Sequence, residues 1–230
     1  MIKKKIILLL CCFLGVVSAC KSQIDFFHEF EANKNFTSKN NKYQYIATAN
    51  WKHFYGGVNW NRLGLNGQVR RRFNQWLLMG GLINIYTYDK DIANYYELRP
   101  FIGVGLNTPV GNALQFGQIF RAESRTFFFK RSDLNETNVR LRYNLNLTYT
   151  FKENTLRETA WRLRGETEWY ILKEQQYQER FVSSNENTIK IIRAFTKNKE
   201  LALAYRVEKF NANFNTEDNI AHTVAFEYNF

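Results

Sequence analysis

Residues 137–151 read TNVRLRYNLNLTYTF, and this stretch decides the fold class. Apart from Thr137, its odd-numbered positions are apolar or aromatic, whereas its even-numbered positions carry only Asn, Arg and Thr. Only an extended strand places successive side chains on opposite faces, so the alternation predicts β-structure. At ~3.3 Å per residue this strand is about 50 Å long, whereas strands of soluble proteins usually have ~5–6 residues. The length favours a membrane-spanning barrel.

The same alternation continues after residue 156, where Trp161 and Trp169 bracket an apolar face. Their spacing corresponds to ~26 Å, close to the ~25 Å apolar band that aromatic girdles flank in transmembrane barrels.

Two features fit this pattern poorly. Arg71 and Arg193 fall on outward faces, so either they lie near the membrane interface or the register is shifted by one. Pro100 predicts a bulge or a strand end, because proline cannot donate a ladder hydrogen bond.

Turn-like clusters divide residues 23–230 into about twelve predicted strands, with ten as the alternative. We expect them to form one all-β domain, a closed antiparallel transmembrane β-barrel, because lipid offers no partner to the unpaired edges of an open sheet. An even count would place both chain ends at the periplasmic rim. The predicted strands are 26–36, 42–55, 58–72, 75–88, 94–106, 113–129, 136–152, 157–172, 176–183, 187–197, 199–211 and 220–230.

Residues 1–22 have the pattern of a secretory signal peptide, with three lysines before an uncharged apolar run that is too short to span a membrane. Cleavage is expected after Ala19 or Ser22. Residues 17–20 also resemble a lipobox, which would lipidate Cys20, and the two alternatives stay open. All three cysteines lie in this segment, so no disulfide is expected in the mature chain.

Lys and Arg outnumber Asp and Glu by 32 − 21 = 11. Four of these lysines belong to the signal peptide, which leaves a mature charge of 11 − 4 = +7. Export and the lack of a long basic block argue against a nucleic-acid partner. The predicted location is the outer membrane of a Gram-negative bacterium, with membrane lipids as partners.

Arg and Glu alternate with apolar residues on the faces that are expected to point into the barrel. We interpret them as a lattice of ion pairs that fills the lumen, since charges removed from bulk water need partners. The alternative is a narrow pore that favours anions. The predicted lumen-facing charges are Glu97, Arg99, Arg121, Glu123, Arg125, Arg140, Arg142, Arg162, Arg164, Glu166, Glu168, Arg206 and Glu208.

Aromatic side chains on the opposite faces are expected to contact the membrane, and the last strand has the alternation typical of a signal for outer-membrane assembly. That alternation predicts the assembly machinery as a second partner. The predicted membrane-facing aromatics are Tyr143, Tyr149, Trp161, Trp169, Tyr205, Phe226 and Tyr228, and the predicted assembly signal consists of Val224, Phe226, Tyr228 and Phe230.

No catalytic residue, metal site or cofactor is predicted. An outer-membrane lipid hydrolase is the enzymatic alternative, and it needs a nucleophile, a histidine base and an orienting group. His53 and His222 fall on outward positions, whereas an inward position is left open for His28 near the start of the first strand. His28 and His222 would come close if the first and last strands pair. An exported soluble β-barrel that binds a ligand is the third class of function left open.

Four short segments carry a resemblance to a known family: residues 97–100 (ELRP), 120–125 (FRAESR), 139–143 (VRLRY) and 205–208 (YRVE). They resemble an outer-membrane family of Bacteroidota catalogued as domain of unknown function 2490. The resemblance implies an outer-membrane β-barrel and gives no catalytic residues or ligands. We therefore expect a structural barrel or a passive barrel for small solutes.

Overall fold

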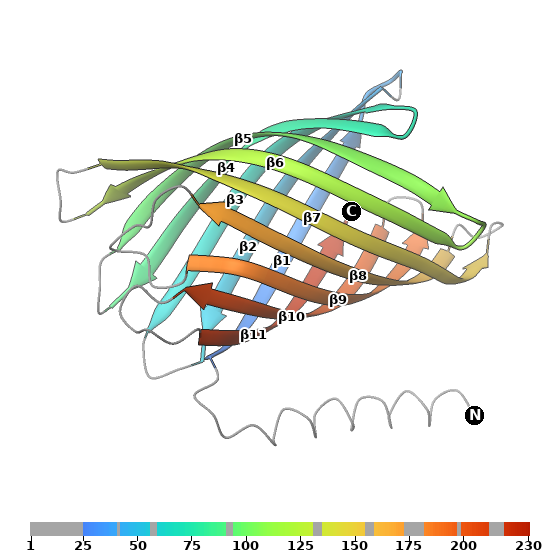
Figure 1. Ribbon diagram of the computed structural model, residues 1–230. Helices are drawn as coiled ribbons and strands as arrows, with labels where there is room; N and C mark the ends of the chain where they lie inside the picture. Colours follow the sequence, from blue (N-terminus) through green and yellow to red (C-terminus); the bar gives the residue numbers. More distant parts are fainter. Residues whose placement is uncertain are drawn as a thin grey trace.

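The computed structural model describes residues 25–40, 42–55, 59–90, 94–130, 135–154, 159–172, 182–196, 199–211 and 219–230. The signal peptide predicted for residues 1–22 lies outside these ranges. Within them, eleven strands close into one barrel, which confirms the predicted all-β fold (Figure 1). The strands are β1 (Asp25–Thr37), β2 (Tyr43–Phe54), β3 (Trp60–Phe73), β4 (Trp76–Asp89), β5 (Tyr95–Val110), β6 (Leu114–Phe129), β7 (Asn135–Asn154), β8 (Thr159–Leu172), β9 (Val182–Thr196), β10 (Lys199–Asn211) and β11 (Asn219–Asn229).

Neighbouring strands in the sequence pair antiparallel, and β1 closes the barrel by pairing parallel with β11. Phe26 lies opposite His222 and Asn33 opposite Asn229 along this seam. An odd number of alternating strands requires one parallel pair at closure. Asp25 and Phe230 therefore lie at opposite rims, and the expectation that both chain ends share a rim is wrong.

The strand count of twelve, and the alternative of ten, are also wrong for the described part of the chain. The difference arises at β9, a single strand where the prediction placed a break at residues 184–186. These polar residues resemble a turn in the sequence. Residues 185–187 instead pair with both β8 and β10, and the Glu186 side chain is only partly exposed. The other predicted strand, 176–183, falls mostly on residues that are not described.

The connections between strands differ in length at the two rims. We call one end the short-turn rim, where strands are joined through residues 38–42, 74–75, 111–113, 155–158 and 197–198. We call the other end the long-loop rim, where strands are joined through residues 55–59, 90–94, 130–134, 173–181 and 212–218. In the turn formed by residues 74–75, Asn74 has a φ of 52°, a left-handed conformation that asparagine tolerates. Phe230 follows β11 at the short-turn rim.

Pro100 causes neither a bulge nor a strand end. It lies opposite Leu82 inside β5. Pairing with β6 is interrupted after Leu98 and resumes at Phe101 in the same register. The missing proline N–H therefore interrupts the ladder locally without displacing the strand, and the expected bulge is a wrong prediction.

Arg71 and Arg193 are on the outward faces near the short-turn rim. The Arg71 guanidinium lies 4.2 Å from the Phe73 ring centroid, and that of Arg193 lies 5.1 Å from the Trp161 ring. Both positions are within three residues of the ends of their strands. The cations thus fit the interface explanation, and no shift of register is needed.

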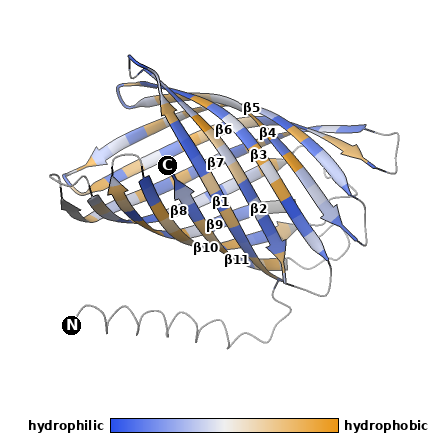
Figure 2. Ribbon diagram, turned by 180° about the vertical axis from the view of Figure 1, so that it is seen from behind, coloured by the Kyte–Doolittle hydropathy of each residue, from blue (hydrophilic) through white to orange (hydrophobic). Residues whose placement is uncertain are grey.

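Hydrophobic and hydrophilic residues alternate along the strands (Figure 2). On β7, Arg140, Asn144 and Asn146 are buried, whereas Val139 and Leu147 are exposed. Soluble proteins show the reverse, with charges outside and large apolar side chains inside. The barrel therefore has an apolar exterior and a polar lumen.

Candidate functional site

Glu123 on β6 is the centre of a group of ion pairs inside the barrel. Its carboxylate lies 2.6 Å from Arg140, 2.7 Å from Arg121 and 3.2 Å from Arg142, and Arg99 follows at 3.9 Å. The Glu123 side chain is 0% exposed. A buried carboxylate is tolerated when cations and hydrogen bonds replace its water, and four guanidinium groups do so here.

Glu97 on β5 extends this group toward the long-loop rim. Arg99 donates to it through two nitrogens, Nε at 2.8 Å and Nη2 at 2.7 Å, which is the bidentate geometry of strong Arg–carboxylate pairs. Arg125 Nε donates to the same carboxylate at 2.6 Å. Glu97 and Arg125 are both almost completely buried. The contacts fix three long side chains against the luminal wall of two neighbouring strands, β5 and β6.

The chain of contacts continues around the barrel through β8, β9 and β10. Arg142 donates to Glu168, and the Tyr170 hydroxyl lies 2.9 Å from Glu168 and 3.1 Å from Glu186. Arg206 Nε is 3.0 Å from Glu186. These contacts connect the Glu123 group to the opposite wall.

Arg206 completes the link to the first two strands. Its Nη1 donates to Glu29 at 2.7 Å and lies 3.9 Å from Glu208, which in turn binds Lys52 at 2.5 Å. Lys52 belongs to β2 and Glu208 to β10, so their contact spans the closing seam between β1 and β11. We call the whole set the ion-pair network.

Two aromatic clusters fill the lumen between the ion-pair network and the long-loop rim. Lys52 Nζ lies 4.6 Å from the Phe27 ring, and Arg125 lies 4.7 Å from the Phe127 ring, so network and clusters are in contact. We call the network and the clusters together the luminal plug. The clusters are Phe27, Phe54, Trp60, Phe210 and Ala221, and Tyr95, Phe127 and Phe129.

Several side chains in this half of the barrel are completely or almost completely buried. Phe127 and Thr87 have 0% exposed area, and Glu97 and Arg125 have 1%. Other members of the network keep some exposed area, such as Arg142 with 16% and Arg206 with 15%. The described side chains therefore occupy much of the lumen on the long-loop side.

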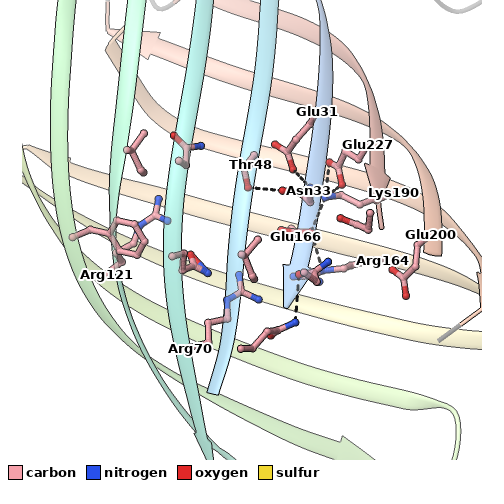
Figure 3. Close-up of a pocket in the computed structure, with 18 of the residues that line it drawn as sticks. Glu31, Asn33, Thr48, Arg70, Arg121, Arg164, Glu166, Lys190, Glu200 and Glu227 are labelled. Carbon is pink, nitrogen blue, oxygen red and sulfur yellow. Dashed lines mark hydrogen bonds and ion pairs between the residues drawn. The ribbon is translucent and has the colours of Figure 1, made fainter. Parts of the chain in front are cut away.

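The half next to the short-turn rim contains a cavity of about 790 Å³ (Figure 3). Its walls carry four cationic and four acidic side chains among amides and hydroxyls, a lining that suits a polar ligand or water rather than an apolar molecule. We call this cavity the chamber. It is lined by Glu31, Asn33, Asn35, Thr37, Gln44, Ile46, Thr48, Asn66, Gln68, Arg70, Ile83, Phe101, Arg121, Arg164, Glu166, Lys190, Glu200, Glu227 and Asn229.

The structure places all thirteen predicted lumen-facing charges on inward faces, and each has an ion pair. Most belong to the ion-pair network, whereas Arg162, Arg164 and Glu166 lie nearer the short-turn rim. Arg162 binds Glu200 at 2.5 Å, and Arg164 Nε lies 2.8 Å from Glu166.

Sequence reasoning missed several members of the lumen. Lys190 lies 2.7 Å from Glu227 and 3.5 Å from Glu166, and its alternation with the outward Ile189 and Ile191 in the predicted strand 187–197 is the signal that points to it. Arg70 was overlooked beside Arg71. The alternation of residues 60–72, with Leu63, Leu65 and Val69 outward, is the signal that would have found it. The remaining missed network members are Glu29, Lys52, Glu186 and Tyr170.

The predicted membrane-facing aromatics are on outward faces. Tyr149, Trp169, Phe226 and Tyr228 are exposed, whereas Tyr143, Trp161 and Tyr205 are partly exposed. Some of the partly exposed rings pack against a neighbour, as Tyr143 does with Trp169 at 5.9 Å between ring centroids. The predicted assembly signal also points outward along β11, with Val224 and Phe230 partly exposed at its two ends.

The histidines do not form the catalytic or metal arrangements considered above. His28 points outward among aromatic rings, not into the lumen as was left open, and its ring lies 4.9 Å from that of Trp51. It faces His53 at 5.2 Å, whereas His222 contacts Tyr205. Among the described residues, no group of three His, Cys, Asp or Glu side chains is placed to hold a metal ion.

Comparisons with known proteins add little to this description. No family model matches the chain, and no curated protein matches it in sequence. In the described residues, no helix has the length and apolarity needed to cross a membrane. The fold is similar to that in "NanC porin structure in rhombohedral crystal form", with 12% sequence identity and a TM-score of 0.45 over 80% of this chain and 87% of that chain.

Proposed function

We propose that this protein is an outer-membrane β-barrel with a structural role and a lumen that is closed on one side. The lipid-facing assignment rests on the exterior, where large apolar side chains are exposed on every strand. A contiguous apolar surface of this extent needs a cover, and a closed barrel satisfies its backbone hydrogen bonds internally, as a bilayer requires. The predicted export signal supports placement in the outer membrane.

The proposed orientation puts the short-turn rim in the periplasm. Outer-membrane barrels have short periplasmic turns and longer extracellular loops, and the connections of the two rims differ in this way. Trp161 near the short-turn rim and Trp169 toward the long-loop rim supply aromatic side chains for both interfaces. The chamber then faces the periplasm and the luminal plug faces outward.

The luminal plug is the observation that carries the closed-barrel proposal. A passive pore needs a continuous aqueous path, whereas buried charges and rings from the strand walls occupy the long-loop half. The second candidate function is the passage of small solutes. The chamber is the one feature that favours it, and passage would also require the luminal plug to move. In planar bilayers we expect no sustained conductance steps from the wild-type protein. Stable, salt-dependent steps would contradict the closed lumen and support the passive pore.

Brominated phospholipids test the lipid-facing assignment directly. Bromine atoms on acyl chains quench tryptophans that contact lipid. Two single-tryptophan variants are compared, one keeping Trp169, which is 38% exposed, and one keeping Trp60, which is 4% exposed; the other four tryptophans are changed to Phe. We expect strong quenching of Trp169 and little of Trp60. Quenching of Trp60 alone would reverse the assignment, and no quenching of either would favour the soluble alternative.

The assembly machinery is the partner proposed for β11. Val224, Phe226 and Tyr228 point outward on a strand whose two edges are paired with β1 and β10 in the closed barrel. Recognition through strand pairing must therefore precede closure. Replacing Phe226 and Phe230 with Ser is expected to leave the precursor in the periplasm; normal membrane levels of this variant would contradict the role. Membership of the family named above stays a prediction.

A further inference from the structure

We propose that Arg70 and Arg164 form a binding site for a small organic anion in the chamber. The proposal relies on the proposed function only in that the barrel is closed around a lumen. The four cations of the chamber differ in whether a carboxylate lies beside them. Arg121, Arg164 and Lys190 each have a carboxylate within 4.0 Å, but among the described residues Arg70 has none.

The charged groups that act on Arg70 repel it, because both Arg164 and Arg72 are cationic. Arg70 comes from β3 and Arg164 from β8, and Figure 3 shows both guanidinium groups in the same part of the chamber. Two like charges that meet inside a barrel are costly without counter-charges. Glu166 supplies one for Arg164, and an anion beside Arg70 supplies the other.

Both arginines have N–H groups left for a ligand. With its amide oxygen turned toward Arg70, Gln68 accepts bonds from Nε and from Nη2, the latter at 2.8 Å, and a guanidinium carries five donors. Arg164 Nε lies close to Glu166 but is a buried nitrogen without a hydrogen-bond partner. Water can bind the free N–H groups, whereas only an anion also balances the charge.

The chemical class follows from the donors and from the space around them. Guanidinium groups bind carboxylates and phosphates through two parallel hydrogen bonds. A volume of about 790 Å³ exceeds that of an inorganic ion and lies in the range of small-molecule sites. Neighbouring amides on β1, β2 and β3 offer further hydrogen bonds to a polar ligand body. The amides are Asn35, Gln44, Asn66 and Gln68.

Glu31, the chamber carboxylate without an ion pair among the described residues, lies far from Arg70 along the barrel wall. Arg70 pairs with Gln44 in register, and Gln44 with Thr37. Glu31 is six residues farther along β1, a backbone separation of about 20 Å at ~3.3 Å per residue. Glu31 therefore does not serve as the counter-charge of Arg70, and the site takes an anion near the short-turn rim.

Binding is tested on the purified protein in detergent micelles by calorimetric titration with sodium phosphate and with sodium acetate. Ionic strength is matched with sodium chloride, because salt screens non-specific attraction. We expect saturable binding of at least one anion, and the stronger one identifies phosphoryl or carboxylate chemistry. Arg70→Gln and Arg164→Gln are expected to lower the affinity at least tenfold. Arg193→Gln, which removes one outward charge, is expected to change it less than twofold.

Urea unfolding of Arg70→Gln separates loss of the site from loss of the fold. Because the substitution removes a repelled charge, the variant is expected to unfold at the same or a higher urea concentration than the wild type in anion-free buffer. Equal affinity of Arg70→Gln and wild type would overturn the site, as would a wild type that binds neither anion saturably. Neither result affects the lipid-quenching experiment, so failure of the site and failure of the proposed function are distinguishable.

Discussion

Glu123→Gln tests the view that the ion-pair network holds the luminal half of the barrel together. The substitution keeps the shape of the side chain and removes its charge. Arg99 retains Glu97, and Arg142 retains Glu168. Arg121 and Arg140 lose the carboxylate with which they pair and have no other within 4.0 Å among the described residues.

The expected magnitude follows from the burial of these groups. Removing one partner of a buried ion pair costs about 3–5 kcal/mol, because the other charge stays buried without compensation. Two guanidinium groups lose their partner here, so we expect the free energy of unfolding to fall by at least about 3–5 kcal/mol. With an m-value of about 2 kcal/mol per M of urea, the unfolding midpoint would shift by roughly 1.5–2.5 M.

The assay is equilibrium urea unfolding in phospholipid vesicles, followed by tryptophan fluorescence and by the heat-dependent mobility of the folded barrel on gels. Glu200→Gln is the matched control. Its carboxylate has one ion pair, with Arg162 at 2.5 Å, and its side chain is 23% exposed. Pairs that solvent reaches contribute about 0–1 kcal/mol, so the control is expected to unfold close to the wild type.

A second substitution distinguishes electrostatics from packing. Adding Arg140→Met to Glu123→Gln removes one of the uncompensated charges, and we expect part of the lost stability to return. The reasoning is refuted if Glu123→Gln and Glu200→Gln have the same unfolding midpoint. It is also refuted if Arg140→Met destabilises the Glu123→Gln variant as much as it destabilises the wild type.

Three further predictions use other parts of the barrel. Gly81→Ala is expected to lower the free energy of unfolding in urea by about 1–3 kcal/mol, because its Cβ would lie 2.3 Å from the Gly67 carbonyl oxygen. A Cβ at Gly67 meets nothing within 4 Å, so Gly67→Ala should match the wild type, and equal stability of the two variants would contradict this. Tyr170→Phe removes the hydroxyl between Glu168 and Glu186, so we expect a loss of about 1–3 kcal/mol in the same assay, and an unchanged midpoint would show that water replaces it. Replacing Arg71 and Arg193 with Glu should reduce insertion into phosphatidylglycerol vesicles more than into phosphatidylcholine vesicles, because each basic side chain near an anionic surface contributes about 1 kcal/mol. Insertion is measured by gel mobility, and an equal reduction in both lipids would argue against headgroup contact.

Local patterns predicted the strands and their faces well. In residues 137–151 the residue type indicates the face of each side chain, and this stretch lies inside β7 (Asn135–Asn154), whose pairing with β8 shifts register only between Thr150 and Lys152. The partners of Glu123 were not predictable in the same way. Arg121 and Arg140 lie on two neighbouring strands, so their distances to Glu123 depend on register and rotamers that no single strand specifies. The alternation placed these side chains in the lumen, and only the fold paired them.

Strand number was harder to predict because closure is not a local property. The seam joins β1 to β11, the two ends of the sequence, and whether they meet parallel or antiparallel depends on the parity of all the strands between. A single misread segment changes that parity. Residues 183–187 (SSNEN) have turn-like composition, yet a strand with one face in a polar lumen tolerates the same residues. Composition is therefore a weak guide to turns wherever both a polar lumen and a loop accept Asn, Ser and Glu.

The division of the lumen into plug and chamber follows from side-chain size along the inward faces. On β1 the inward side chains become smaller toward the short-turn rim, from Phe27 to Asn35 and Thr37. On β10 they change from Phe210 and Arg206, at the long-loop end, to alanines at 204 and 202. Because all the strands enclose one lumen, large side chains at one level fill it and small ones at another leave it hollow. The small inward residues of β1 and β10 therefore leave space at the short-turn side, although Arg70 and Arg164 on other strands also reach into it.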